Sequence, residues 1–349
     1  MSAGNTIRKL QCLLMASAWL PLTAPAEVYE LPPDGSDVVG AVGIVEARAE
    51  DTLLDIARRH GLGYEDIIRA NPEVDTWVPG DGTKVVLPTR FVLPPGPRKG
   101  LVLNLAEYRM YYFPPPAQGE AALVMTYPMS IGRMDWQTPL GRTSIISKVR
   151  NPSWYVPDSI RAEHAADGDP LPRIVPPGPE NPLGDFAMRL GLPGYLIHGT
   201  NKPAGVGMRV THGCIRMFPE DIDFLFGQIA TNTAVRIIDQ PVKLGWDGET
   251  LVMEVHRQLE VATAVEAADE TLLQSGIDVD TGIESESVVD EPQQRDRMTL
   301  LTEQFVAATN ARPGELDWNA AEELLDRASG IPLPVGRSIK NAATSAASE

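Results

Sequence analysis

The sequence is short of cysteine, of positive charge and of long apolar segments. Two cysteines occur among its 349 residues, and Cys12 lies in a segment that we expect to be removed on export. The remaining thiol, that of Cys214, then has no partner for an internal disulfide bond. A lone thiol in an oxidising compartment is a liability unless its reactivity is used, so Cys214 is the first candidate for chemistry.

Basic residues are outnumbered by acidic ones. The 30 Lys and Arg residues stand against 47 Asp and Glu, which gives a formal net charge of −17. Because contacts to phosphates need clustered Lys and Arg, we expect no nucleic-acid partner. Acidic residues accumulate between Arg257 and Arg295, where no Lys or Arg occurs. That pattern is typical of a solvated, loosely ordered linker.

The N-terminus has the pattern of a secretion signal. Arg8 and Lys9 precede an apolar stretch over 10–22, and the small residues of 24–26 match a cleavage site. The sequence therefore predicts a signal peptide over 1–26 and an exported mature protein. The apolar stretch is shorter than the roughly 20 residues of a spanning helix, although an uncleaved anchor is the alternative. No later segment is long and apolar enough to span a membrane.

Residues 41–89 have the pattern of a small separate unit. Two short helices are expected, one from the apolar spacing that begins at Leu53 and one over 64–70. Strands over 43–47 and 84–87 flank them. This order resembles the LysM module, which implies binding of glycans that contain N-acetylglucosamine. A small α+β domain without a glycan role is the alternative.

The rest of the chain is dominated by short strands separated by Gly and Pro turns. This favours a mainly β fold, as a β-sandwich or a partly closed barrel, with strands such as 101–105 and a helix over 221–229. The Pro- and Gly-rich stretch 152–184 is too long for a minimal connection, and such loops are often binding loops or lids. We expect a C-terminal region over 241–349 that consists of the acidic linker and a short helix.

The run over 198–217 carries the strongest chemical signal. A neutral thiol is a poor nucleophile, and with a pKa of about 8.5 only a few per cent of a cysteine is ionised near neutrality. The imidazole of His198 can accept the proton of Cys214 and later deliver it to a departing amine. The backbone N–H groups of Gly213 and Cys214 could face a developing oxyanion. Thr211 can hydrogen-bond within the loop.

Other residues of the run have supporting or alternative roles. No carboxylate is placed to orient His198, so its second ring nitrogen is expected to donate to a backbone carbonyl such as that of Gly199. His212 is expected to be a wall of the site. His198, His212 and Cys214 could instead hold zinc, but a fourth ligand is not evident, and structural zinc sites are normally closed by four. We therefore expect no metal and no cofactor.

The run resembles the signature of the L,D-transpeptidases, the YkuD-type catalytic domain. The matching residues are His198-Gly199-Thr200 and Thr211-His212-Gly213-Cys214-Ile215-Arg216. The resemblance places the catalytic domain at 97–240. The order of signal peptide, LysM-like module and catalytic domain is similar to the periplasmic subgroup that attaches Braun-type lipoprotein to peptidoglycan, which implies a periplasmic location.

The resemblance implies a specific reaction. Cys214 would attack the bond between diaminopimelate and D-alanine in a tetrapeptide stem, release D-alanine and hold the peptide as a thioester. The lysine amine of a Braun-type lipoprotein would resolve it, with 3→3 cross-linking of stems and hydrolysis as alternatives. Carbapenems would acylate Cys214. Arg216, Thr200 and Trp154 are candidate substrate contacts, although core packing explains Trp154 equally well. A wall-binding protein without activity would give no reason to keep both His198 and Cys214.

Overall fold

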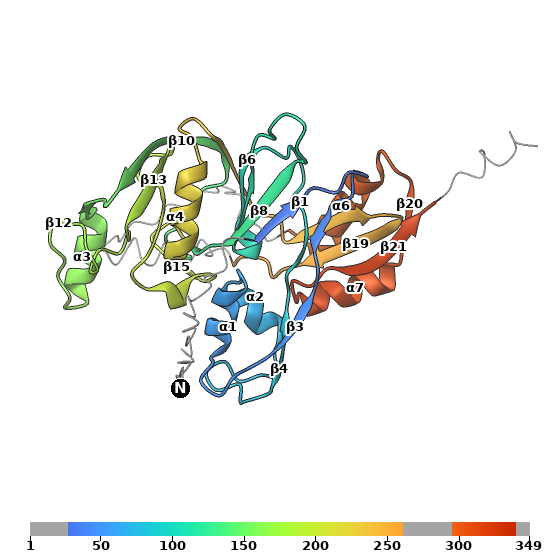
Figure 1. Ribbon diagram of the computed structural model, residues 1–349, viewed down its shortest axis with the longest axis horizontal. Helices are drawn as coiled ribbons and strands as arrows, with labels where there is room; N and C mark the ends of the chain where they lie inside the picture. Colours follow the sequence, from blue (N-terminus) through green and yellow to red (C-terminus); the bar gives the residue numbers. More distant parts are fainter. Residues whose placement is uncertain (1–26, 261–294, 340–349) are drawn as a thin grey trace, which may run out of the picture.

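Strands outnumber helices in the described chain, which comprises residues 27–260 and 295–339 of a computed structural model (Figure 1). The predicted signal peptide over 1–26 and most of the predicted acidic linker lie outside these residues. The mainly β class is confirmed, with a curled sheet and few helices. No helix in the described ranges is long and apolar enough to cross a membrane.

A nine-stranded mixed sheet forms the centre of the molecule. In spatial order its strands are β1 (Glu27–Glu30), β8 (Leu123–Pro128), β7 (Arg109–Phe113), β6 (Gly100–Asn104), β17 (Ala234–Ile238), β10 (Gly141–Arg150), β13 (Phe186–Leu190), β14 (Leu196–His198) and β16 (Ile215–Arg216). Most neighbours are antiparallel, but β17 pairs in parallel with β6, and β14 pairs in parallel with β16. The second parallel pair brings together the two ends of the run that carries the chemical signal.

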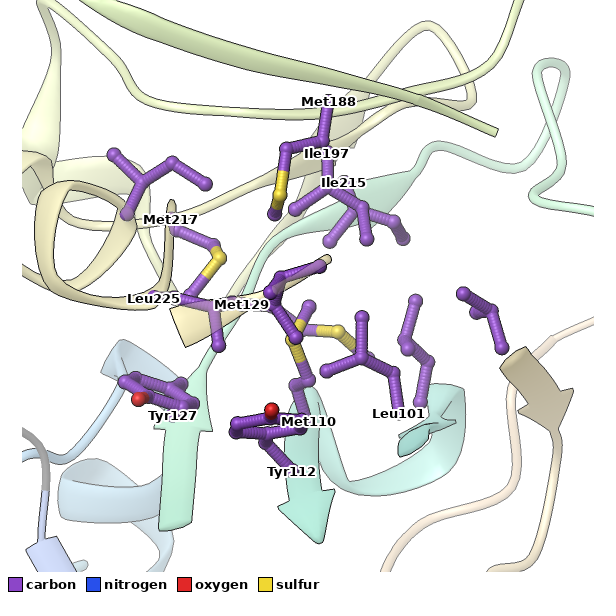
Figure 2. Close-up of a cluster of buried hydrophobic side chains, with 14 of the residues drawn as sticks. Leu101, Met110, Tyr112, Tyr127, Met129, Met188, Ile197, Ile215, Met217 and Leu225 are labelled. Atoms are coloured by element: carbon purple, nitrogen blue, oxygen red, sulfur yellow. The ribbon is translucent and has the colours of Figure 1, made fainter. Parts of the chain in front are cut away.

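The core of this sheet is made of Leu, Ile, Met and Tyr side chains (Figure 2). Ile197 of β14 and Ile215 of β16 both point into it, and both are fully buried. The helix α4 (Pro219–Gln228) follows β16 and buries Ile222, Leu225 and Phe226 against the sheet. Since each such side chain contributes roughly 1.5–3 kcal/mol when buried, this core fixes the strands from which the site projects.

The N-terminal module has the predicted order of strand, helix, helix and strand. Its elements are β3 (Gly43–Glu46), α1 (Leu53–Arg59), α2 (Tyr64–Ala70) and β4 (Lys84–Leu87). Thr52 begins α1 through a capping box with Asp55. The side chain of Asn71, which ends α2, hydrogen-bonds the backbone of Ile67 and Val86 and so ties α2 to β4.

The module shares its hydrophobic core with the central sheet. One apolar cluster joins Leu53 and Ile67 of the two helices to Tyr111 of β7. The short strands β2 (Val38–Gly40) and β5 (Arg90–Val92) pair with each other beside it. The hydrophobic core of the module is therefore continuous with that of the central sheet, and the two do not pack as separate bodies.

The C-terminal region is more extensive than the sequence indicated. A four-stranded antiparallel sheet and two helices lie on both sides of the acidic segment, as β18 (Val242–Asp247), β19 (Thr250–Val255), α6 (Arg297–Thr309), β20 (Gly314–Leu316), α7 (Trp318–Arg327) and β21 (Leu333–Ser338). The helices bury Leu300, Leu301 and Leu324 in a core of their own. The short helix expected in the C-terminal region corresponds to α7, whereas the four-stranded sheet was not expected.

A buried ionic cluster joins this C-terminal unit to the central sheet. The ammonium of Lys243 lies 2.6 Å from Glu107 and 2.9 Å from Glu254. His256 lies 2.6 Å from Glu254. Tyr111 also donates to Glu107, at 2.9 Å. All five side chains are buried, and burying charges in this way is tolerated only when they are paired.

Two smaller features lie beside the candidate site. The insert between β10 and β13 contains β11 (Trp154–Tyr155), α3 (Asp158–Ala166) and β12 (Ile174–Val175). The loop between β14 and β16 contains β15 (Arg209–Thr211), which pairs in parallel with β9 (Ile131–Gly132). The long predicted loop over 152–184 is thus an ordered insert with its own helix.

Candidate active site

The parallel pairing of β14 and β16 brings the segments that carry His198 and Cys214 side by side. His198 is in register with Arg216, and Ile197 is in register with Ile215. Because side chains alternate along a strand and both isoleucines enter the core, His198 and Arg216 project from the opposite face. His198 is the last residue of β14, and Cys214 directly precedes β16, so two residues that are distant in the sequence lie on neighbouring segments.

The imidazole of His198 is buried and oriented. Its Nδ1 donates to the carbonyl of Gly199 at 2.7 Å, as predicted, which leaves Nε2 with a lone pair. Burial is the larger cause and the positive charge of Arg216 the smaller one, and together they lower the pKa of His198 to about 4. The ring is therefore neutral near pH 7 and can accept a proton.

The thiol of Cys214 is in its neutral form at rest. Burial raises its pKa, while a backbone hydrogen bond from Leu196 and the charge of Arg216 act in the opposite direction. Its Sγ lies 3.7 Å from the carbonyl oxygen of Gly194. Since the thiol and the imidazole are both neutral, a thiolate at Cys214 would have to be formed by proton transfer.

The peptide units around Cys214 are held by two threonines. Thr211 donates to the carbonyl of Cys214 at 2.6 Å. Thr138 donates to the carbonyl of Gly213 at 2.8 Å and accepts from the N–H of Gly132 at 3.0 Å. Gly213 has φ +91°, and a Cβ there would lie 2.8 Å from the ring of Tyr195, so only glycine fits.

His212 faces the insert. Its Nε2 lies 3.1 Å from a carboxylate oxygen of Glu163 in α3, and the ring of Trp136 meets it edge-on. Glu163 also accepts from Arg133 at 2.6 Å. Burial, and then Arg133, lowers the pKa of His212, while Glu163 opposes this shift. His212 is thus held against the insert, and its role as a wall of the site stays a prediction.

The remaining predicted site residues lie in different settings. Arg216 is half-buried, and its Nε, which is itself buried, has no hydrogen-bond partner among the described residues. Thr200 is buried and accepts from the N–H of Lys202 at 2.9 Å, within the loop as predicted. Trp154 pairs with Val175 across β11 and β12 in the insert.

The alternative zinc ligands do not form a cluster. Over 27–260 and 295–339, the group of three His, Cys, Asp or Glu ligand atoms within 4.8 Å of one another is Glu107, Glu254 and His256. The ammonium of Lys243 lies between those carboxylates, where a cation would otherwise be.

Sequence reasoning missed three residues of the site, Thr138, Glu163 and Arg133. Thr138 had a signal, because it opens a Thr-Pro-Leu-Gly turn, which is typical of a shaped loop. Glu163 and Arg133 had none, since their charges are ordinary for an exposed helix or turn. Only the docking of α3 beside His212 brings them to the site.

Comparisons with known proteins identify the family of the chain. Residues 98–237 match the YkuD family, described as the L,D-transpeptidase catalytic domain. Over 329 residues the chain is 35% identical to the probable L,D-transpeptidase YcfS of Escherichia coli (strain K12), which covers 92% of each. It is 38% identical over 246 residues to the probable L,D-transpeptidase YbiS of the same strain, covering 69% of this chain and 79% of YbiS.

Solved structures were also compared. L,D-transpeptidase 3 from Mycobacterium tuberculosis, in complex with a faropenem-derived adduct, aligns with 46% of this chain and 66% of its own at 21% identity, with a TM-score of 0.29. The full-length likeness to YcfS is the stronger finding. On that likeness and on the matched catalytic domain, the chain belongs to the L,D-transpeptidase family and is an enzyme that acts on peptidoglycan.

Proposed function

We propose that this protein is an exported peptidoglycan L,D-transpeptidase in which Cys214 is the nucleophile and His198 the general base and acid. The observation that carries the proposal is the parallel pairing of β14 with β16, because His198 ends the first strand and Cys214 directly precedes the second. The bond from His198 to Gly199 supports it, because it leaves Nε2 free to take the proton.

The first half of the reaction releases D-alanine. Nε2 of His198 takes the proton of Cys214 as Sγ attacks the carbonyl carbon of the diaminopimelate–D-alanine bond. The N–H groups of Gly213 and Cys214 bind the resulting oxyanion, and such donors are each worth about 100- to 1000-fold in rate. The imidazolium then gives its proton to the D-alanine nitrogen, the C–N bond breaks, and a thioester remains.

The second half transfers the peptide to an amine. The amine attacks the thioester carbon and loses a proton to Nε2 of His198. The C–S bond breaks, and the thiolate of Cys214 recovers that proton. Among acceptors we favour the C-terminal lysine amine of a Braun-type lipoprotein, with 3→3 cross-linking and hydrolysis as the competing outcomes. The support is the order of signal peptide, LysM-like module and catalytic domain, which is similar to that of the subgroup that attaches Braun-type lipoprotein to peptidoglycan.

Arg216 is proposed to bind a substrate carboxylate. Its guanidinium lies beside both His198 and Cys214, and its Nε lacks a partner in the described chain. A carboxylate of the stem peptide would supply a charge-assisted hydrogen bond there. Thr200 and Trp154 remain candidate contacts to the rest of the stem.

Three further assignments belong to the same proposal. Residues 1–26 would be a cleaved signal peptide, and the protein would act in the periplasm. The N-terminal module would bind peptidoglycan as a LysM-like module. Carbapenems would acylate Cys214, as the resemblance to the family implies.

Mass spectrometry of muropeptides tests the reaction directly. Purified enzyme is incubated with tetrapeptide muropeptides, with and without a lipoprotein peptide that ends in lysine. We expect release of D-alanine and a product in which the lysine is joined to the stem. Cross-linked dimers alone, or tripeptides alone, would assign the alternative acceptors.

The matched control is Cys214→Ala, which should release no D-alanine. If that variant turned over at the wild-type rate, the proposed nucleophile would be wrong.

A further inference from the structure

The loop that joins the imidazole to the thiol is held by the N-terminal module. The backbone N–H of Tyr64, the first residue of α2, donates to the carbonyl of Val206 at 3.0 Å. The N–H of Glu65 donates to the carbonyl of Gly207 at 3.3 Å. Val206 and Gly207 lie midway along the loop whose ends are His198 and Cys214. The first turn of α2 therefore replaces solvent as the partner of this loop.

The two backbones are in direct contact through a pair of glycines. A Cβ on Gly63 would lie 2.7 Å from the Cα of Gly207 and 3.2 Å from the Cβ of Pro128. A Cβ on Gly207 would lie 2.4 Å from the nitrogen of Tyr64. Since real Cβ atoms do not approach so closely, any side chain at either position must push the loop away from the helix.

The first turn of α2 is itself fixed to the central sheet. The carboxylate of Asp66 accepts from the N–H of Gly63 at 2.9 Å and from the guanidinium of Arg109 at 2.6 Å. Arg109 belongs to β7, is 1% exposed, and lies over the ring of Phe91 at 4.3 Å. A fully buried, paired arginine in the sheet thus sets where α2 begins, and α2 sets the loop.

A second contact holds the chain after Cys214. Arg58 of α1 makes two hydrogen bonds, of 2.7 and 2.8 Å, to the carboxylate of Glu220 at the start of α4. Between these two contacts, the module and the catalytic-loop segment leave a cavity of about 160 Å³. It is lined in part by Leu54, Pro203 and Phe218. The module's own hold on the loop is therefore concentrated at the first turn of α2, while β9 holds the second half of the loop by pairing with β15. In Figure 1, α1 and α2 lie beside the lower ends of α4 and β15.

We infer that residues 63–66 are a positioning segment of the active site, and that the module is part of the catalytic unit as well as a candidate glycan-binding module. By fixing Val206 and Gly207, the segment fixes the loop that sets where His198 stands relative to Cys214. This inference rests on the proposed roles of those two residues. A displacement of about 1 Å at a reacting group can cost about 100-fold in rate, so a small shift of the loop is enough.

Substitution of Gly63 tests the inference. The φ of Gly63 lies outside the left-handed region, so alanine and serine fit its backbone, and their effect comes from the contact with Gly207. We expect Gly63→Ala and Gly63→Ser to lower kcat for D-alanine release by roughly 10- to 100-fold, with little change in KM. Serine is a good N-cap residue, so this variant keeps α2 stable while retaining the clash.

Alkylation of Cys214 by iodoacetamide, followed against pH in the full mature protein, supplies a readout that needs no substrate. The two Gly63 variants should show an altered rate and pH profile of alkylation. Gly43→Ala is the matched control, because its Cβ would lie 3.5 Å from Leu87, an ordinary contact in the same module. This variant should behave as wild type.

Two results would overturn the inference. One is a wild-type kcat and alkylation profile in both Gly63 variants. The other is an activity loss that only follows the loss of folded protein, with an unchanged alkylation profile in the folded fraction. If instead the proposed substrate were wrong, wild-type enzyme would release no D-alanine, and the alkylation profiles would still report on the loop.

Discussion

The protonation states of His198 and Cys214 depend on burial and on one neighbouring charge, that of Arg216. Burial alone would favour a neutral thiol and a neutral imidazole, and Arg216 modifies both. Its positive charge further lowers the pKa of His198 and works against the burial that raises the pKa of Cys214. Arg216 therefore has an electrostatic role in addition to its proposed carboxylate contact.

Replacement of Arg216 should move the pH dependence of acylation. With the charge removed in Arg216→Gln, the pKa of His198 should rise from about 4. The neutral, proton-accepting ring is then lost at a higher pH, so the acidic limb of kcat/KM should shift upward. Arg216→Lys keeps the charge and should leave the limb in place. An unshifted limb in Arg216→Gln would contradict the assignment, and stopped acylation assays across pH measure it.

Thr138 holds the peptide next to the proposed nucleophile through its hydroxyl group. Thr138→Val leaves the N–H of Gly132 and the carbonyl of Gly213 without this partner in a buried place. We expect a loss of about 1–3 kcal/mol in the free energy of unfolding and a fall in kcat of roughly 10-fold or more. Thr138→Ser keeps the hydroxyl and should restore kcat. Urea unfolding and D-alanine release measure the two effects, and a wild-type kcat in Thr138→Val would show that the hydroxyl is dispensable.

Among the elements, helices and strands with strong local signals were predicted well. The helix α2 and the strand β4 have the predicted bounds, because Asn71-Pro72 ends the helix and an apolar run defines the strand. The predicted helix over 221–229 begins earlier, at Pro219, since proline is favoured in a first turn. Capping and periodicity act over a few residues, so the sequence contains them in full.

The role of the module as an element could not be read from the sequence. Its pattern indicates a separate unit, but its core continues into the sheet through Val102, Tyr111 and Val124. Removing the module would expose these side chains, so a truncation cannot separate wall binding from catalysis. Point substitutions such as those at Gly63 are the better tool.

At the scale of the whole molecule, the N-terminal module, the central sheet and the C-terminal unit are joined by buried polar contacts. Lys243 of β18 meets Glu107, which follows β6, and Glu254 of β19, all almost inaccessible to solvent. Val92 of β5 donates its N–H to Glu254 at 2.6 Å, which adds the linking strand to the cluster. Burial raises the pKa of Glu107, whereas Lys243 and then His256 outweigh burial and lower the pKa of Glu254 to about 2.

Removal of the lysine tests how far this cluster holds the units together. Lys243→Met leaves two carboxylates buried without their cation, and breaking a buried pair in this way typically costs about 3–5 kcal/mol. We expect that loss in the free energy of unfolding from denaturant titration. Lys84→Met, at an exposed position of β4, should stay within about 0.5 kcal/mol of wild type. A similar small change for Lys243→Met would show that the cluster does not stabilise the fold.

The contacts of the candidate site are of two kinds, those between residues close in the chain and those between residues far apart in it. The bond from His198 to Gly199 and the turn from Thr211 to Cys214 join residues close in the chain, so the motif over 198–217 contained them. The family followed from the same run, which also predicts the nucleophile, and the mainly β class followed from the short strands separated by Gly and Pro turns. Such features depend on local chemistry, which a sequence states directly.

Contacts between distant segments depend on the tertiary fold and could not be predicted from the sequence. Glu163 on His212, Asp66 on Arg109 and Lys243 on Glu107 each join residues more than 40 positions apart. Each pair consists of common charged residues, and nothing local distinguishes them from solvated ones. The pairing of strands and the docking of α2 and α3 select these partners, because burial gives a charge pair its strength only after the surrounding apolar core has formed.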